Sequence, residues 1–451
     1  MAMMGERQVD QGSLFYEFCL EDHVPPGHLL RSIDRFVELD GVRRHLAPYY
    51  SAMGRPSIDP ELLIRMLTVG YCHGIRSERR LCEEVHLNLA YRWFCRLGLD
   101  GDVPDHSTFS KNRHGRFREG DLLRHVFETV LSRCVAEGLV GGEGFAVDAS
   151  LIEADVDRRK RIDGADGLPM DRTSRAIEEY LAALDDAAFG GASDVTPRYL
   201  SPTDPAARWT AATRGPAVFA YSANYLIDLD HAIIVDVEAS SAIRTAEVSA
   251  ARTMIERAQE RFGLYPARLA GDTAYGSGEM LGWLVEERGI EPHIPVWDKS
   301  RREDGTFSRA DFIYDNATDT YTCPGGKPLT TTGRVHDGRT VLYRAAQHHC
   351  GACPMKQRCC PNTPHRRIPR DVQEGARDLA RELAGTDAYY TSRRQRKKVE
   401  MLFAHLKRIL RLGRLRLRGP TGARDEFLLA ATAQNLRKMA KLIPMPQPTS
   451  T

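Results

Sequence analysis

Three acidic residues are notable because none of them is needed to form the local structure around it. Asp148 lies within residues 145–152, an alternating stretch with the period of a β-strand, and Asp272 ends a second such stretch at 267–272. Aspartate is disfavoured in strands, so a carboxylate at these places needs another reason. Glu400 is an isolated acid in a strongly basic segment near the C-terminus. Together the three acids predict a functional site.

If the two strands are neighbours in one sheet, Asp148 and Asp272 meet at one edge, where Glu400 could join them. Mg²⁺ prefers carboxylate oxygens and leaves its other positions to water and substrate phosphate. Cleavage of a phosphodiester can use two such ions ~3.5–4 Å apart, one activating the attacking oxygen and one stabilising the leaving oxygen. We therefore expect Asp148, Asp272 and Glu400 to be catalytic and to bind Mg²⁺, or Mn²⁺ in its place.

The segment around Glu400 predicts how this acid is positioned. Residues 393–407 contain no Pro or Gly and carry apolar residues at helical spacing. On that helix four charged residues share one face: Arg393, Arg396, Glu400 and Lys407. A basic helix beside the metal ions would meet the DNA backbone, so we expect DNA contacts from Arg393, Arg396, Lys397 and Lys407. The alternative is a solvated basic helix in which Glu400 only pairs with Arg396 or Arg393.

The composition is that of an ordinary globular protein. The chain has 451 residues, 42% of them hydrophobic and 27% charged, which suggests roughly two to four domains. Its net charge is only +2, so the local basic segment says more about a polyanionic partner than the total does. We find no secretory signal and no apolar run near the ~18–20 residues of a membrane span. A soluble, cytoplasmic protein without a membrane partner is expected.

The N-terminal part, residues 1–140, predicts short helices with tight breaks. Asp59 followed by Pro60 marks one helix start and Ser77 another, and two further helices follow. Short helices with outward arginines suit a helix-turn-helix-like DNA-binding module. The alternative is a small helical bundle that mediates only protein contacts.

From Gly144 onward the pattern alternates between strands and helices. We expect a strand, a two-stranded hairpin, a helix, a strand, a helix and a strand, at residues 145–152, 219–238, 245–261, 267–272, 277–288 and 291–296. Residues 156–215 are read as an insertion or long connection around one helical run, 174–184. A final amphipathic helix at 426–441 is expected to pack on this core.

The interval between Asp272 and Glu400 is longer than one strand and one helix require, so it must hold an insertion. Five of the ten cysteines crowd into it. A Cys-x-x-Cys pair with outlying thiols suits a tetrahedral zinc site, and we expect the ligands Cys323, Cys350, Cys353 and Cys359. Alternatives for the fourth ligand are Cys360, His348 and His349. Short strands would flank the site at 312–314, 320–322 and 341–343. The competing interpretation is a reduced cysteine cluster that packs without metal.

The motifs, taken in order, resemble those of DDE transposases from bacterial insertion sequences. Gly54-Arg-Pro-Ser-Ile-Asp-Pro through Arg92-Trp-Phe, and Pro104-Asp-His-Ser-Thr-Phe, resemble the helical N-terminal domain of that family. Val147-Asp-Ala-Ser resembles its first catalytic-acid segment and Gly271-Asp-Thr-Ala-Tyr-Gly its second.

The basic helix is similar to the third catalytic-acid segment of the family. That pattern is Tyr, two residues, Arg, three residues, Glu, six residues and Lys. Arg396, Glu400 and Lys407 fit this register, whereas Arg393 stands at the Tyr position and Tyr389 lies two turns before Arg396.

The resemblance implies an α/β fold, with an RNase H-like mixed sheet flanked by helices, an all-α N-terminal domain and a small zinc-ribbon-like insertion. The expected domains are a helical DNA-binding or assembly domain, a catalytic domain in two segments, a Cys-rich insertion and a disordered tail, at 1–140, 141–300 with 385–443, 301–384 and 444–451.

The expected function is DNA transposition. The protein would bind the terminal inverted repeats of its element as a homodimer, cut the double-stranded DNA and join the 3′-hydroxyl ends to target DNA, in the nucleoid of a bacterial cell. Two alternatives remain: an RNase H-like nuclease without strand transfer, and a catalytically inactive DNA-binding relative.

Overall fold

The computed structural model describes residues 18–51, 53, 57–168, 173–211, 215–298 and 302–445. The expected motif at 54–56 and the tail from 446 onward lie outside these residues. The chain divides into two compact units, Met1–Leu122 with Leu436–Thr451, and Leu123–Asn435. Within the described ranges no helix has both the length and the apolar character needed to cross a membrane.

The first unit is helical, as the sequence predicted. Its helices are α1 (Leu20–His23), α2 (Leu29–Asp34), α3 (Val42–Leu46), α4 (Pro60–His73), α5 (Glu78–Leu87), α6 (Leu89–Phe94), α7 (Ser107–His114) and α8 (Arg116–Glu119). The Asp59 side chain caps α4 by accepting the Glu61 N–H at 3.1 Å, and Ser77 caps α5 in the same manner. The expected start signals are confirmed.

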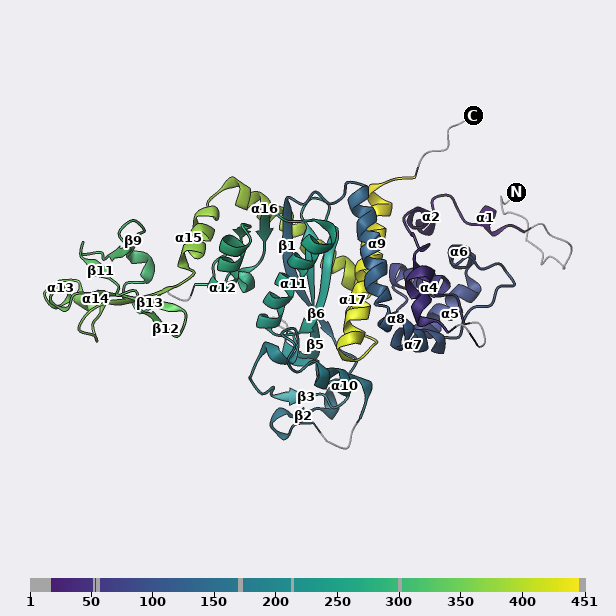
Figure 1. Cartoon of the computed structure of the whole chain (residues 1–451), viewed down its shortest axis with the longest axis horizontal. Helices are drawn as coiled ribbons and strands as arrows, with labels where there is room; N and C mark the ends of the chain where they lie inside the picture. The colour runs from purple at the N-terminus through teal and green to yellow at the C-terminus, as the bar shows by residue number, and fades with distance from the viewer. Residues whose placement is uncertain are drawn as a thin grey trace, which may run out of the picture. The chain divides into compact units, whose positions relative to one another are not determined.

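The second unit contains a mixed sheet in the order β4-β5-β1-β7-β8, with β6 also paired to β5 (Figure 1). The strands are β1 (Gly144–Glu153), β4 (Arg208–Ala211), β5 (Ala217–Asp228), β6 (Ile234–Ser241), β7 (Arg268–Ala270) and β8 (Glu291–His293). β1 is antiparallel to β5 and parallel to β7, and β7 is parallel to β8. The predicted succession of strands and helices is confirmed.

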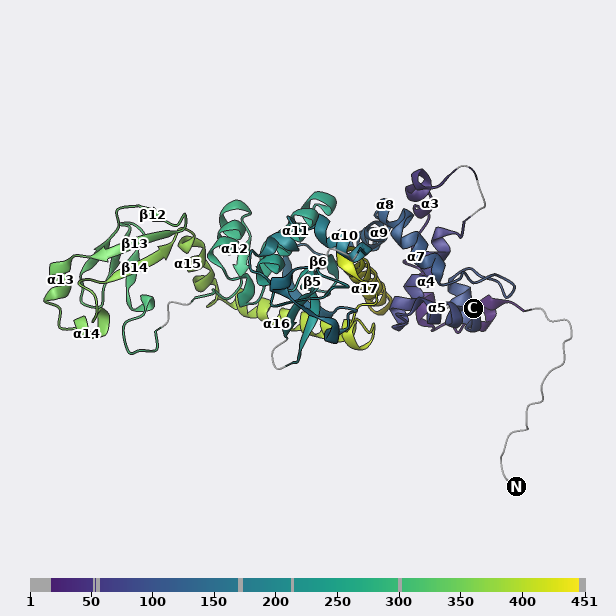
Figure 2. The ribbon, with the colours of Figure 1, turned by 90° about the horizontal axis from the view of Figure 1, so that it is seen from below.

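Long helices cover this sheet on both faces. They are α9 (Leu122–Ala136), α11 (Arg244–Phe262), α16 (Asp387–Arg408) and α17 (Gly419–Leu442). In Figure 2, α11 and α16 lie on opposite sides of β5 and β6. Gly263 ends α11 in the left-handed conformation, with φ of 63°. The packing of α17 on the core is confirmed: Asn435 Oδ1 accepts the Ile234 N–H at 2.9 Å, and Asn435 Nδ2 donates to the Ile234 carbonyl at 2.8 Å.

Two helices differ in length from the sequence prediction. α16 begins at Asp387, where the Thr386 side chain caps it by accepting the Tyr389 N–H, and so it starts before the predicted helix. α17 begins at Gly419 and has Pro420 in its first turn. A proline is tolerated there because the first turn of a helix needs no hydrogen bond from its N–H. In the connection 156–215, the predicted helical run is α10 (Arg175–Ala182).

The insertion forms a second sheet, in the order β12-β13-β11-β10-β9 with β14 on β13. The predicted strands correspond to β9 (Ile313–Asp315), β10 (Thr320–Thr322) and β13 (Thr340–Ala345). The sequence did not predict β11 (Pro328–Thr330), β12 (Val335–His336), β14 (Arg367–Asp371) or the helices α13 (Gln347–Gly351), α14 (Lys356–Cys359) and α15 (Glu374–Leu383). Its core is aromatic and thiol-rich, with buried Tyr321, Tyr343 and Cys350 among others.

Candidate active site

Asp148 and Asp272 occupy equivalent positions relative to two neighbouring parallel strands, Asp148 within β1 and Asp272 two residues past the end of β7. Ala146 of β1 is the register partner of Ala270 of β7. Each aspartate lies two residues beyond its member of this pair, so the two carboxylates occur at the same level of the sheet. The meeting of the two aspartates that the sequence predicted is therefore a consequence of strand register.

Asp272 lies just beyond its strand, which corrects the sequence prediction that the strand runs through it. β7 ends at Ala270, and Asp272 instead caps the short turn Thr273–Tyr275 by accepting the Ala274 N–H at 2.7 Å. Arg244 holds this turn from α11, since its Nε donates to the Ala274 carbonyl at 3.0 Å. The hydrogen bond to the turn thus fixes the orientation of the Asp272 carboxylate.

Asp148 is half-buried and paired with a cation. Its Oδ2 lies 3.1 Å from Arg396 Nη2, and its Oδ1 accepts the Ala149 N–H at 2.9 Å. Burial raises the pKa of Asp148, and nearby Asp272 adds to the rise, whereas Arg396 and the Ala149 N–H oppose it. The shift shows that burial outweighs the pairing of this carboxyl group with Arg396.

Glu400 lies on the face of α16 that covers Asp148. One turn before it, Arg396 contacts Asp148. One turn after it, the Phe403 ring packs against Tyr225 at 5.5 Å, and Tyr225 is the cross-strand partner of Asp148. Glu400 itself is exposed. Arg396 is committed to Asp148, so the alternative in which Glu400 pairs with Arg396 is not what the structure shows.

The three predicted acids do not form a complete metal site. Across the described ranges, no group of three or more His, Cys, Asp or Glu side chains lies close enough to hold one metal ion. Asp272 raises the pKa of Asp148, whereas Glu400 is not among the main groups that act on Asp148. Two carboxylates at one level fit part of a divalent-cation site, because carboxylate oxygens are the ligands that Mg²⁺ prefers.

A fourth carboxylate, Glu247, reaches the same region and was missed from the sequence. It lies in the first turn of α11, and its Oε1 accepts a hydrogen bond from Ser222 Oγ at 2.6 Å. Burial raises the pKa of Glu247, and both Asp272 and Asp148 raise it further. An acid in the first turn of a helix is common, because it balances the helix dipole. The sequence therefore offered no signal that Glu247 belongs with the aspartates.

The basic residues of α16 divide into two kinds. Arg396 is half-buried in its ion pair, whereas Arg393, Lys397 and Lys407 are exposed and have no carboxylate partner among the described residues. Tyr389 is buried against the ring of His293, with 5.7 Å between ring centroids. Tyr389 therefore packs the start of α16 against β8. Arg393, which stands at the Tyr position of the expected pattern, is exposed.

The clustered cysteines share one small cavity. Cys323, Cys350, Cys353, Cys359 and Cys360 line a space of about 30 Å³ together with His349. A Cβ atom at Gly325 would lie 3.6 Å from Cys323 Sγ and 3.9 Å from Cys353 Sγ. All are free thiols, and burial raises the pKa of Cys359 to about 12. The five thiols line one cavity, but within the described ranges no three of them lie close enough together to bind one metal ion.

Comparison with known proteins identifies two domains. Residues 18–115 match the family model described as a transposase domain (DUF772), and residues 322–440 match the model described as a transposase DDE domain. The second match includes Glu400 and begins after Asp148 and Asp272.

Among solved structures, the chain is similar to a cryo-EM structure of the piggyBac transposase synaptic complex with hairpin DNA. It is 9% identical, over 92% of this chain and 74% of that chain, with a TM-score of 0.33, which is too low to establish a shared fold. The two family matches, a transposase domain followed by a transposase DDE domain along one chain, are typical of insertion-sequence transposases.

Proposed function

We propose that this transposase cuts DNA at the ends of its element and joins them to target DNA. The observation that carries the proposal is the placement of Asp148 and Asp272 at one level of two adjacent parallel strands, beneath a basic helix that carries Glu400. The strand order, with an antiparallel hairpin beside β1 and parallel strands beyond it, supports an RNase H-like fold.

Asp148, Asp272 and Glu400 would hold the divalent cations, Mg²⁺ or Mn²⁺. When bound, such ions activate the attacking oxygen and stabilise the leaving oxygen. Arg396 Nη2 lies 3.1 Å from Asp148 Oδ2, and we propose that Arg396 turns to a DNA phosphate when a cation binds this carboxylate, with Arg393, Lys397 and Lys407 contacting the backbone.

The reaction has two steps at the same acids. Water first attacks the phosphorus at the element end, which breaks the P–O3′ bond and frees a 3′-hydroxyl. That hydroxyl then attacks a target phosphodiester, forming one P–O bond and breaking another. Since two ends must be joined together, we propose a homodimer on DNA. The helices of residues 1–140 would recognise the terminal inverted repeats.

Strand transfer is tested by supplying precut ends. The protein is incubated with Mg²⁺, a labelled duplex that ends in the element's 3′-hydroxyl and a plasmid target. We expect label joined to plasmid. Cutting of uncut ends without joining would support the nuclease alternative, and DNA binding without either reaction would support an inactive relative.

The pH dependence of cleavage tests the pairing of Arg396 with Asp148. Arg396→Gln is expected to shift the acid limb of the pH–rate profile to higher pH. The arginine lowers the pKa of Asp148, so its removal raises that pKa, and the ionised carboxylate then forms only at higher pH. The measurement is the initial cleavage rate against pH. Lys397→Gln, an exposed change on the same helix, should leave the limb in place. Equal limbs in wild type and Arg396→Gln would contradict the prediction.

We further propose that the cysteine cavity holds one structural Zn²⁺, through Cys323, Cys350, Cys353 and Cys359. Four thiolates suit this ion, and its binding would deprotonate the thiols. The purified chain should contain stoichiometric zinc, measured by elemental analysis, and Cys353→Ser should lose it. Cys134→Ser, a buried thiol in α9, should retain it. A purified wild-type chain that is folded but contains no zinc would support the metal-free cysteine cluster.

A further inference from the structure

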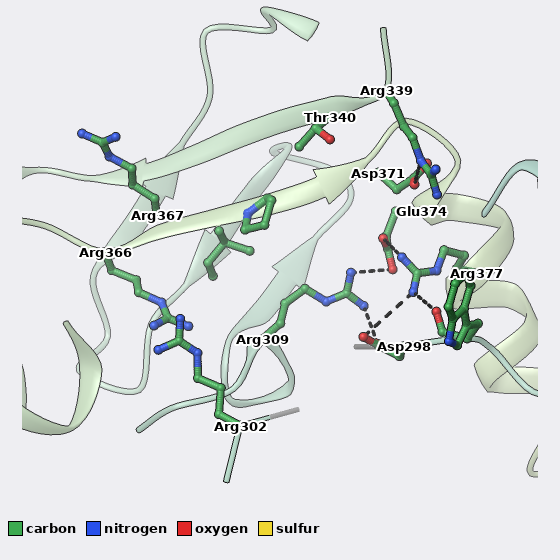
Figure 3. Close-up of a pocket in the computed structure, with 13 residues that line it drawn as sticks. Asp298, Arg302, Arg309, Arg339, Thr340, Arg366, Arg367, Asp371, Glu374 and Arg377 are labelled. Atoms are coloured by element: carbon green, nitrogen blue, oxygen red, sulfur yellow. Dashed lines mark hydrogen bonds and ion pairs between the residues drawn. The ribbon is translucent and has the colours of Figure 1, made fainter. Parts of the chain in front are cut away.

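A second cavity lies at the insertion and involves none of the acids discussed above. It has a volume of about 470 Å³ and lies between the insertion sheet and α15 (Figure 3). Its charged lining residues are Arg302, Arg309, Arg339, Arg366, Arg367 and Arg377, with Asp298, Asp371 and Glu374. Arginines therefore outnumber carboxylates in its wall.

One side of the cavity is fully paired. Glu374 is buried, and its carboxylate lies 2.6 Å from Arg309 Nη1 and 2.9 Å from Arg377 Nη1. Burial alone would raise the pKa of Glu374, but Arg309 and Arg377 hold it below its ordinary value. Arg339 Nε similarly lies 2.8 Å from Asp371. The carboxylates on this side are therefore paired with arginines, and these ion pairs connect α15 with the insertion.

The other side holds two arginines that face each other in Figure 3, Arg302 and Arg366. Arg366 is only 7% exposed, and its Nη atoms donate to the carbonyls of Cys359 and Phe307 at 2.9 and 2.8 Å. Its Nε has no partner in the described structure. Arg302 Nη1 donates to Thr306 Oγ1 at 2.9 Å. Neither arginine forms an ion pair with a carboxylate of the described residues.

Two facing guanidinium groups repel each other. Burial lowers the pKa of Arg366, and Arg302 lowers it further. The carboxylate that acts on Arg366 is Asp304, which already accepts the Thr306 N–H at 2.9 Å. Arg367, exposed at the rim, donates only to His365 among the described residues. An anion between Arg302 and Arg366 would remove the repulsion, and guanidinium groups match phosphate oxygens in a two-bond geometry.

We propose that Arg302 and Arg366 bind one phosphate of a DNA backbone, and that Arg367, which points away from them on β14 (Figure 3), contacts an adjacent phosphate. The insertion would then hold DNA at a place outside the acidic site. This inference rests on the proposed function, because it assumes that DNA is the polyanion that reaches the cavity. A phosphate contact carries no base information, so this site would fix the position of the DNA without reading its sequence.

The salt dependence of DNA binding tests this site. Arg366 also supports two backbone carbonyls, so the test uses the double variant Arg302→Gln with Arg367→Gln. Binding of the full chain to a labelled duplex from the element end is measured in Ca²⁺ over a range of salt concentrations. Each lost phosphate contact should reduce the slope of log Kobs against log [salt] by roughly 0.9. We expect a reduction of about 1 to 2. Arg334→Gln, an exposed arginine of the insertion that does not line the cavity, should not change the slope.

The outcomes separate this inference from the proposed function. If wild type binds and cuts the duplex while the double variant keeps the slope of Arg334→Gln, the phosphate site is wrong and the proposed function stands. If wild type neither cuts nor joins ends, the proposed function fails whatever the slopes are. Equilibrium dialysis with inorganic phosphate is the second arm. Retention by wild type, lost in the double variant without a change in DNA slope, would assign the cavity to free phosphate and overturn the inference.

Discussion

Asp148→Asn and Asp272→Asn are each expected to reduce cleavage of a labelled element end by at least about 10³-fold. Charge stabilisation at a metal-assisted phosphoryl transfer contributes several kcal/mol, and each 1.36 kcal/mol is about tenfold in rate. Asparagine keeps the size of aspartate but removes the charge that a divalent cation needs. The measurement is the single-turnover cleavage rate with Mg²⁺.

The matched control for these variants lies on the same strand. Glu153→Gln removes a carboxylate near the end of β1 whose Oε1 is 2.8 Å from Arg158 Nη2, and it should keep most of the activity. Wild-type rates in Asp148→Asn would contradict the account. Glu400→Gln should reduce the cleavage rate as much as the two aspartate variants do. If Glu247→Gln abolished cleavage and Glu400→Gln did not, the third carboxylate would come from α11 instead of α16.

Asp236→Ala is expected to destabilise the second unit by about 3–5 kcal/mol, because it leaves the buried Arg124 without its closest carboxylate and with Glu238 only at 4.0 Å. Arg124 and Asp236 are both buried and paired, and Arg257 Nε lies 2.8 Å from the same carboxylate. Such a loss is a large share of the stability of a typical domain, about 5–15 kcal/mol. The urea midpoint at constant m-value measures it.

An exposed ion pair provides the control for this stability prediction. Glu143→Ala removes a carboxylate with 77% side-chain exposure, 3.9 Å from Arg268 Nη1, and should change stability by less than about 1 kcal/mol. Equal midpoints for Asp236→Ala and Glu143→Ala would show that the buried pair contributes nothing beyond a surface pair.

Local patterns were sufficient to predict the elements that carry the two aspartates. Asp59 with Pro60, and Gly263, mark helix ends through their own backbone preferences, so one sequence reveals them. The alternation around Asp148 predicts a buried strand for the same reason. That the aspartates meet depends on the pairing of β1 with β7, which could be stated from the sequence only as a condition.

Features set by tertiary contacts could not be predicted in the same way. Glu247 reads as an ordinary acid at a helix start, and only the packing of α11 places it near the aspartates. Arg302 and Arg366 are far apart in sequence, and Arg366 is positioned by its hydrogen bonds to the carbonyls of Cys359 and Phe307. The strands that were missed in the insertion are mostly short, and their pairing, more than their own pattern, defines them.

The most direct test is a metal-specificity switch at Asp148 and Glu400. Cysteine replaces each acid in turn, and cleavage is measured with Mg²⁺ and with Mn²⁺. Mg²⁺ requires hard oxygen ligands, whereas Mn²⁺ tolerates a thiolate better. We expect Asp148→Cys and Glu400→Cys to be inactive with Mg²⁺ and to regain cleavage with Mn²⁺, while wild type cuts with both. Full activity of Glu400→Cys with Mg²⁺, or no recovery of either variant with Mn²⁺, would contradict it.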